Sequence, residues 1–356
     1  MASVNEDLRD RAIRHAVAIA RYGNGLSDKL VRLLNSADKE ILAKLASGLA
    51  EIDERGQFLS ASARKHLASL LDEIRALNTA IYEQLSDALV SELGDFGAGE
   101  AEFQRKALVS SIGVDLSTKL PSAARMRAII TEVPMDGHLL KGWTDKMEQG
   151  RIDRITQALR TGMVQGETTD QLVRRIRGTK AKQYSDGILD ISRRSTQSIV
   201  RTAVSHISNA TAQETWKANE HVIKGWQFVA TLDSRTTIGC SALSGQVFPI
   251  GEGPIPPRHI RCRSITVAVT KSFRELGIEA DELPKGKQAS MDGQIAGDMQ
   301  FSDWLRSKGE ATQVEILGTK RAELFNSGKL DLQDFIKKDG TVLTLAELKT
   351  LYPNLL

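Results

Sequence analysis

Residues 201–209 read RTAVSHISN, residues 225–236 read GWQFVATLDSRT, and residues 256–263 read PPRHIRCR. The first segment places apolar residues at helical spacing and predicts part of a long helix over residues 192–219. The second begins with the tryptophan, phenylalanine and valine that are typical of a strand, and the alternation over 264–269 predicts another strand. Between them, Ser244-Gly245 predicts the turn of a hairpin. This stretch therefore predicts a helix followed by a small antiparallel sheet.

The chain before residue 133 is predicted to be almost continuously helical. Leucine and isoleucine recur every three or four residues in two rows, and each row marks one apolar face of a helix. The rows are Leu30, Leu33, Leu34, Ile41, Leu45, Leu49 and Ile52, and then Leu67, Leu70, Leu71, Ile74, Leu77, Ile81, Leu85 and Leu89. We predict that Ser60 or Ser62 caps the second helix and that Gly94-Asp95-Phe96-Gly97 ends it. We interpret the rows as a bundle core, with docking on a partner's helices as the alternative.

Further helices are predicted over residues 123–130, 139–148, 152–163 and 171–177, and short ones follow after residue 300. A capping residue precedes helix 171–177 and Gly178 ends it, while Thr344 caps the last short helix. We therefore predict an α+β fold with an extended helical N-terminal half, a compact central domain with a small antiparallel sheet, and a C-terminal tail of short helices. The predicted domains are 1–135, 136–272 and 273–356, with an exposed connector at 284–288.

Length and composition limit the class of protein. The chain has 356 residues, which leaves room for about two domains of roughly 150 residues each. Its 41% hydrophobic residues allow a sizeable core, and its net charge of +3 does not by itself indicate a nucleic-acid binder. No run approaches the ~20 apolar residues that cross a bilayer, and the acidic N-terminus lacks the features of a secretory signal. We expect a soluble protein, or one built into a soluble assembly.

Both cysteines of the chain lie in the central stretch, near a histidine. Cys240, His259 and Cys262 are of the residue types that zinc prefers, and the last two are close enough in sequence to face one ion. Asp233 or His206 could supply a fourth ligand, so zinc is the candidate cofactor. Two alternatives stay open. The cysteines are small buried residues beside a hydrogen-bonded histidine, or they form a Cys240–Cys262 disulfide.

The segment Asp233-Ser234-Arg235-Thr236 follows the predicted strand and allows two interpretations. In a hydrolytic site, Asp233 and Arg235 would act with His259 as the general base. We favour a structural brace, in which the Asp233 carboxylate accepts backbone N–H groups and Arg235 pairs with it or with a carbonyl. The sequence shows no serine nucleophile on a recognisable elbow and no pair of carboxylates at catalytic spacing.

Two basic clusters are candidates for contact with phosphate groups. They are Arg174, Arg175, Arg177, Lys180 and Lys182 before the long helix, and Arg258, Arg261, Arg263 and Lys271 around the second cysteine. Such contacts depend on salt and are indifferent to base sequence. No recognition helix, glycine-rich phosphate loop or stacking platform accompanies them. The alternative is a solvated face or an interface with an acidic partner.

Several short motifs occur together in this chain in a recognisable order. They are Gly162-x-x-x-Gly166-x-Thr168, Arg201-Thr202, Asn209, Trp226, Asp233-x-Arg235-Thr236, Cys240, Ser244-Gly245 and Pro256-Pro257-x-His259-x-x-Cys262-Arg263. In these motifs the chain resembles the Mu F-like family of phage head morphogenesis proteins, also called minor head or minor capsid proteins. Two positions depart from the family pattern. Ile260 follows His259 where proline is frequent, and Ser264 follows Arg263 where many members have another cysteine.

The resemblance implies a non-enzymatic protein of the virion that acts in capsid assembly and head morphogenesis. Its expected partners are the portal protein, the major capsid protein and double-stranded DNA, with no membrane in the assembled head. It is expected in the host cytoplasm during assembly. The structural brace then comprises Arg201, Asp233, Arg235 and Thr236. The rival interpretations are a metal-dependent hydrolase or nuclease centred on Asp233, Cys240 and His259, and a sequence-indifferent DNA-binding protein that works outside the particle.

Overall fold

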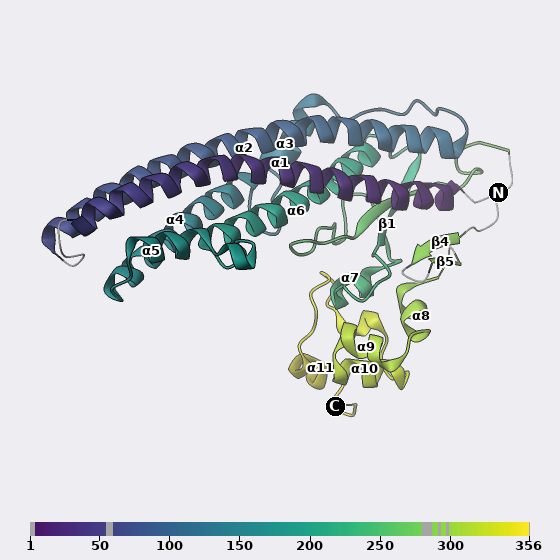
Figure 1. Ribbon diagram of the computed structural model, residues 1–356. Coiled ribbons are helices and arrows are strands. Elements are labelled where there is room, and N and C mark those ends of the chain that lie inside the picture. The colour runs from purple at the N-terminus through teal and green to yellow at the C-terminus, as the bar shows by residue number, and fades with distance from the viewer. Residues whose placement is uncertain (1–3, 55–59, 280–286, 291–292, 297–298, 356) are drawn as a thin grey trace. The chain divides into compact units, whose positions relative to one another are not determined.

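The computed structural model describes residues 4–54, 60–279, 287–290, 293–296 and 299–355 (Figure 1). The chain divides into two compact units. The helical unit consists of Arg21–Asp95 and Ile130–Val204, and the sheet unit consists of Met1–Ala20, Phe96–Ile129 and Ser205–Leu356. Three long helices contribute residues to both units: α1 (Val4–Glu54), α2 (Ala61–Ile112) and α6 (Ile188–Lys217). None of the described helices contains a stretch long and apolar enough to span a membrane.

The helical unit is built on the pair α1 and α2, which lie side by side in Figure 1. Two ion pairs show that the helices are antiparallel. Lys29 Nζ lies 2.5 Å from Glu92 Oε1, and farther along α1, Lys44 Nζ lies 2.7 Å from Glu73 Oε2. The predicted leucine and isoleucine rows are buried between the helices of the chain, with two half-buried exceptions. The interpretation of these rows as a bundle core is therefore confirmed.

The remaining helices of this unit are α4 (Leu140–Val164), α5 (Thr169–Arg177) and the short 3-10 helix η1 (Lys180–Lys182). Of these, α5 begins and ends at residues of the expected types. Thr168 forms a capping box with Gln171 before α5, and Gly178 is the C-cap. Ahead of α2, Ser60 Oγ accepts the N–H of Ala63 at 3.0 Å. These side chains satisfy backbone groups that a helix end leaves without partners.

Helix α4 is one continuous helix, whereas the sequence predicts two, over 139–148 and 152–163. The residue at the predicted break, Arg151, is entirely buried. Arg151 Nη2 donates to Asp38 Oδ1 on α1 at 2.5 Å, and Arg193 Nη2 on α6 donates to Asp38 Oδ2 at 2.5 Å. One buried carboxylate thus joins three helices. A break in α4 would move Arg151 away from Asp38 and leave buried charges without partners.

Helix α2 also continues where an end is predicted, through Gly94-Asp95-Phe96-Gly97 to Ile112. In the sheet unit, Gly97 faces α3 (Ala123–Thr131) and α6. A Cβ atom at Gly97 would lie 3.1 Å from Met126 Cε and 3.3 Å from Ile207 Cγ2. The glycine therefore permits close packing of neighbouring helices. The predicted end is wrong because this packing outweighs the roughly 1 kcal/mol that glycine costs inside a helix.

The sheet unit contains the predicted small antiparallel sheet. Its strands are β1 (Ile223–Val229), β2 (Val247–Phe248) and β3 (Ile265–Thr270), in the order β2-β1-β3. Both pairings are antiparallel, and Trp226 on β1 lies opposite Phe248 on β2 and Ala268 on β3. Trp226 and Phe228 are buried while Gln227 between them is half-buried, as the alternation predicts.

Strand β3 lies at the edge of the sheet, and two asparagines cover its outer side. Asn209 Oδ1 on α6 accepts the N–H of Thr266 at 2.9 Å and the Thr266 hydroxyl at 3.1 Å. Asn5 Oδ1 on α1 makes the same two contacts with Thr270, also at 2.9 and 3.1 Å. The backbone donors at these positions are therefore satisfied by helices rather than by another strand.

The short helical segments after the sheet share its hydrophobic core. They are α8 (Phe301–Arg306), α9 (Glu310–Leu317), α10 (Thr319–Asn326), the 3-10 helix η2 (Leu332–Phe335) and α11 (Leu345–Leu351). Trp304, Phe325 and Phe335 are buried in one cluster with Trp226, and Thr344 caps α11. The predicted tail of short helices is confirmed. A separate antiparallel pair, β4 (Lys287–Ser290) and β5 (Gly293–Ala296), precedes them. Most of the predicted connector 284–288 lies outside the described residues.

Candidate metal centre

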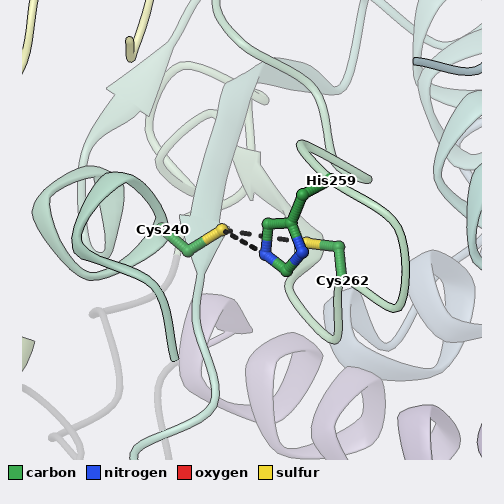
Figure 2. A group of neighbouring side chains, drawn as sticks. All are labelled: Cys240, His259 and Cys262. Atoms are coloured by element: carbon green, nitrogen blue, oxygen red, sulfur yellow. Dashed lines mark hydrogen bonds between the residues drawn. The ribbon is translucent and has the colours of Figure 1, made fainter. Parts of the chain in front are cut away.

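Three side chains that could ligate a metal ion converge in the sheet unit and are called the metal-ligating group below (Figure 2). Cys240 lies on the short helix α7 (Ile238–Leu243) after β1, and His259 and Cys262 lie in the loop that leads from β2 to β3. Cys240 Sγ is 3.7 Å from Cys262 Sγ and 3.7 Å from His259 Nε2. One donor atom of each residue lies within 4.8 Å of the other two. The structure thus brings together three of the residues predicted from the sequence.

Both ends of α7 are tied by hydrogen bonds, which fixes the position of Cys240. Thr237 is the N-cap residue, and its Oγ1 accepts the N–H of Cys240 at 3.4 Å. At the other end, Ser244 is the C-cap residue, and its Oγ accepts the N–H of Ala230, which follows β1, at 3.2 Å. The helix that carries Cys240 is therefore attached to the end of the central strand.

The loop that carries His259 and Cys262 is shaped by its own backbone. The Cys262 N–H donates to the His259 carbonyl at 3.0 Å, and Arg261 between them adopts a left-handed φ of 63°. His259 Nδ1 lies 3.0 Å from the Ile260 carbonyl oxygen. Because a carbonyl oxygen only accepts, Nδ1 carries the hydrogen in neutral His259, and Nε2 presents its lone pair toward Cys240.

The two thiols differ in acidity. The hydrogen bond from Cys240 lowers the pKa of the Cys262 thiol against the effect of burial, and contacts with His259 and with the backbone N–H groups of Arg258 and Ser264 lower it further. The same Cys240–Cys262 hydrogen bond, together with burial, raises the pKa of Cys240. The two thiols therefore titrate as a pair, which loses its first proton much more easily than its second.

The donor set and its burial limit the chemistry. Cys240 and Cys262 are 1% and 5% exposed, and His259 is half-buried. Both cysteines are free, so their sulfur atoms are available as donors. Two sulfurs and one imidazole nitrogen suit zinc and other soft or borderline metal ions. A buried donor set of this kind suits a structural ion better than a catalytic one, which needs an open position for substrate.

Asp233, one of the two candidates for the fourth ligand, is not part of this group in the portion of the chain that the structure describes. Arg263 holds its carboxylate through both terminal nitrogens, with Nη2 donating to Oδ1 at 2.7 Å. Oδ1 also accepts the Arg235 N–H at 3.0 Å, and the Thr236 hydroxyl lies 3.4 Å from it. Burial by itself raises the pKa of Asp233, but the bonds from Arg263 bring it below its usual value. Asp233 thus joins the loop after β1 to the residues before β3.

The other two residues proposed for the site lie on α6. His206 belongs to the sheet unit and is not a member of the metal-ligating group in the described chain. Arg201 belongs to the helical unit, where a Cβ atom at Gly23 would lie 3.7 Å from the Arg201 Cα atom. The contribution of Arg201 to the brace stays a prediction.

The three arginines at the end of α5 differ in the side chains that they contact within the chain. Arg175 is paired with Glu167, with Nε 3.1 Å from Oε2. The Arg177 guanidinium carbon lies 5.9 Å from the centre of the Tyr184 ring. Arg174 is exposed. All three arginines lie in the last turn of α5, where positive charge stabilises a helix C-terminus.

The arginines around Cys262 are similarly divided. Arg258 Nη2 donates to the Asp339 carbonyl at 2.8 Å, and Arg263 is paired with Asp233. Arg261 is exposed. Contact of nucleic acid with Arg174, Arg175, Arg177, Arg261 and Arg263 stays a prediction.

Sequence reasoning missed three features of this region: helix α7, the pairing of Arg263 with Asp233, and the Ser264 hydroxyl, which is hydrogen-bonded to the Cys240 sulfur. Helix α7 has a local signal in the sequence, because Thr237 precedes Cys240 by three residues, which is the spacing of an N-cap residue. The Asp233 pairing has no such signal, because its residues are 30 positions apart in the sequence.

Comparison with known families covers the whole of this region. Residues 153–267 match the family model described as phage Mu protein F like protein. This segment is a phage Mu protein F-like domain. The match begins within α4 and ends in β3, so the Mu F-like domain contains the metal-ligating group and the residues around Asp233. The resemblance seen in the sequence motifs is confirmed, and the family is one of phage head proteins. No curated protein and no solved structure matches the chain.

Proposed function

We propose that this chain is a non-enzymatic minor head protein that acts in phage capsid assembly and head morphogenesis. The observation that carries the proposal is the match of residues 153–267 to the phage Mu protein F-like family. The protein works in the host cytoplasm during assembly and remains in the virion. Its partners in this role are the portal protein or the inner surface of the major capsid protein.

The arrangement around the cysteines supports a structural role over the rival hydrolase or nuclease. That rival requires Asp233 to act together with Cys240 and His259. The Asp233 carboxylate is instead bonded to Arg263, and both cysteine side chains are buried. A water nucleophile and a substrate phosphate would both need access to the metal ion.

The burial of the apolar rows bears on how partners bind. In the helical unit, Leu34, Leu45 and Leu85 are fully buried within the chain. These rows are therefore not available to a partner unless the bundle opens. Contact with the portal or capsid would use the exposed polar faces of the helices, which favours an interface sensitive to salt.

Contact with packaged DNA is the finer part of the proposal and rests on the end of α5. Arg174 is exposed, and so are Lys180 and Lys182 in η1, which begins three residues after the end of α5. Arg174→Glu is expected to weaken binding of double-stranded DNA and to flatten its salt dependence, because each phosphate contact adds about 0.9 to the salt slope. Arg194→Glu, on a different helix and paired with Asp190, is the matched control.

The role itself is tested in particles of the phage that encodes the chain. Quantitative mass spectrometry of purified heads is expected to find the protein in far fewer copies than the major capsid protein. Disruption of its gene is expected to yield aberrant or empty heads, and supply of the protein in trans is expected to restore them. Purified heads that lack the protein, or normal heads from the disrupted phage, would overturn the proposal.

Two histidine variants of the purified chain test the rival hydrolase or nuclease. His259→Ala removes the histidine of the metal-ligating group, and His221→Ala removes an exposed histidine whose Nε2 lies 2.8 Å from the Leu116 carbonyl. A nuclease or hydrolase activity of the purified chain that disappears only in His259→Ala would favour the rival.

A further inference from the structure

We infer that Cys240, His259 and Cys262 bind one structural Zn²⁺ ion per chain, and that this ion clamps α7 and the 256–262 loop around the C-terminal segment. The inference concerns how the sheet unit is held together. It does not depend on the role in the phage head, and either proposal can fail without the other.

Two of the three distances between the donor atoms already fit a zinc site. Zinc bonds of ~2.3 Å to sulfur and ~2.0 Å to nitrogen in a tetrahedron place two sulfurs ~3.8 Å apart and a sulfur and a nitrogen ~3.5 Å apart. The measured separations are 3.7 Å from Cys240 Sγ to Cys262 Sγ and 3.7 Å from Cys240 Sγ to His259 Nε2. Both separations that involve Cys240 therefore match the ideal values within about 0.2 Å, and the third, between the donors of Cys262 and His259, is no more than 4.8 Å.

The surroundings of the donors also suit a bound cation. The Ile260 carbonyl accepts from His259 Nδ1 and leaves Nε2 as the ligand atom. Backbone N–H groups of Arg258 and Ser264 point to the Cys262 sulfur. Such donors stabilise a metal-bound thiolate. No further Cys, His, Asp or Glu joins the group among the residues the structure describes, so this chain supplies three of the ligands from its own side chains.

Both segments that carry ligands contact one turn of the C-terminal segment. On α7, a Cβ atom at Gly239 would lie 3.2 Å from the Gly340 carbonyl oxygen, and Leu243 Cδ1 would lie 3.0 Å from a Cβ atom at Gly340. From the other side, Arg258 Nη2 donates to the Asp339 carbonyl at 2.8 Å. The turn at Asp339-Gly340 is therefore held between α7 and the ligand loop.

The ion would act through this arrangement. The ligands on α7 and in the loop are 19 and 22 residues apart in the sequence. A bond from each segment to one ion replaces weak sulfur contacts with strong coordinate bonds, so metal binding contributes directly to folding. Without the ion, α7 and the loop separate more easily, and the turn between them loses its support.

The first measurement is the metal content of the purified full-length chain, prepared under reducing conditions and loaded with zinc. One zinc ion per chain is expected by elemental mass spectrometry after removal of free metal. Cys240→Ser and His259→Ala are expected to lower the retained zinc at least about tenfold. His221→Ala is the matched histidine control and is expected to keep the wild-type content.

The second measurement uses the unaltered chain, so that misfolded variants cannot decide the result. Removal of zinc with a chelator is expected to accelerate hydrogen–deuterium exchange in residues 238–262 and 331–343. Addition of zinc is expected to reverse the change, while exchange in residues 21–52 of α1 stays the same. Magnesium added in place of zinc is expected to have no effect, because sulfur ligands do not suit it.

Three results would overturn the inference. The first is a zinc content near zero in the loaded, reduced wild-type protein. The second is a protein that lacks two hydrogen atoms by intact mass under the same conditions and binds no zinc, which identifies a Cys240–Cys262 disulfide. The third is bound zinc whose removal leaves exchange over residues 331–343 unchanged.

Discussion

Replacement of Asn209 by alanine is expected to loosen strand β3 far more than the same replacement at Asn5. Each asparagine accepts the N–H and the hydroxyl of one threonine, at identical distances of 2.9 and 3.1 Å. Their surroundings differ. Asn209 is 3% exposed, whereas Asn5 is exposed. Water can therefore replace the lost oxygen at Asn5 but not at Asn209.

The size of the effect follows from the groups left without partners. A buried donor that loses its acceptor costs about 1–3 kcal/mol. Asn209→Ala leaves the Thr266 N–H in that state and also removes the bond from Asn209 Nδ2 to the Ser205 carbonyl, at 2.8 Å. We therefore expect a loss of about 2–3 kcal/mol for Asn209→Ala and about 0.5–1 kcal/mol for Asn5→Ala.

Hydrogen–deuterium exchange of the peptide covering residues 264–271 measures both losses in the intact chain. Since 1.4 kcal/mol is a factor of ten, exchange is expected to accelerate roughly 30- to 150-fold in Asn209→Ala and roughly 2- to 5-fold in Asn5→Ala. Asn209→Asp keeps the acceptor for Thr266 and is expected to fall between them. Equal acceleration in the two alanine variants would refute the reasoning, because it would remove burial as the deciding factor.

Three further outcomes are expected. Asp38→Ala leaves the buried Arg151 guanidinium without its carboxylate and should lower the free energy of unfolding by about 3–5 kcal/mol in urea titrations. Asp233→Asn should lower the thermal midpoint at neutral pH but not in strong acid. Arg263 holds the folded-state pKa of Asp233 below the unfolded value of about 3.9, so its stabilisation exists above that value and is lost as the pH falls through the folded pKa. Ser264→Cys puts a thiol beside Cys240 and should slow the release of zinc to a chelator by about tenfold or more, as followed with a colorimetric indicator.

Each of these has a control in the same chain. Asp72→Ala removes an exposed partner of Arg75 and should cost less than about 0.5 kcal/mol. For Asp233→Asn, a midpoint difference from wild type that persists unchanged into strong acid would contradict the expected linkage. Ser264→Ala should release zinc no more slowly than the wild type, and an equal rate in Ser264→Cys would count against the position assigned to that side chain.

The parts of the fold that could be predicted are those with local signals. The leucine rows of α1 and α2, the alternation in β1 and β3, and the threonine caps of α5 and α11 depend on residues only a few positions apart. The continuity of α2 through Gly97 and of α4 through Arg151 could not be predicted. Each depends on packing or pairing with segments far away in the sequence.

The candidate site shows the same division. Cys240, His259 and Cys262 could be identified by residue type, and the structure brings them together. The place of Asp233 outside this group follows from its pairing with Arg263. That pairing depends on how two loops approach each other across β1 and β3, and sequence spacing carries no information about it.

The contact between Asn5 and Thr270 links residues that are 265 positions apart. The start of α1 also supplies Val4 and Leu8 to the core around the sheet. A fragment trimmed to residues 153–267 would therefore lack the segment of α1 that covers β3 and the core around the sheet, although it contains the entire family match. On the ribosome, α1 cannot complete the sheet unit until β3 and the C-terminal helices that share its core have emerged, so this part of the protein is expected to fold only after nearly the whole chain has been made.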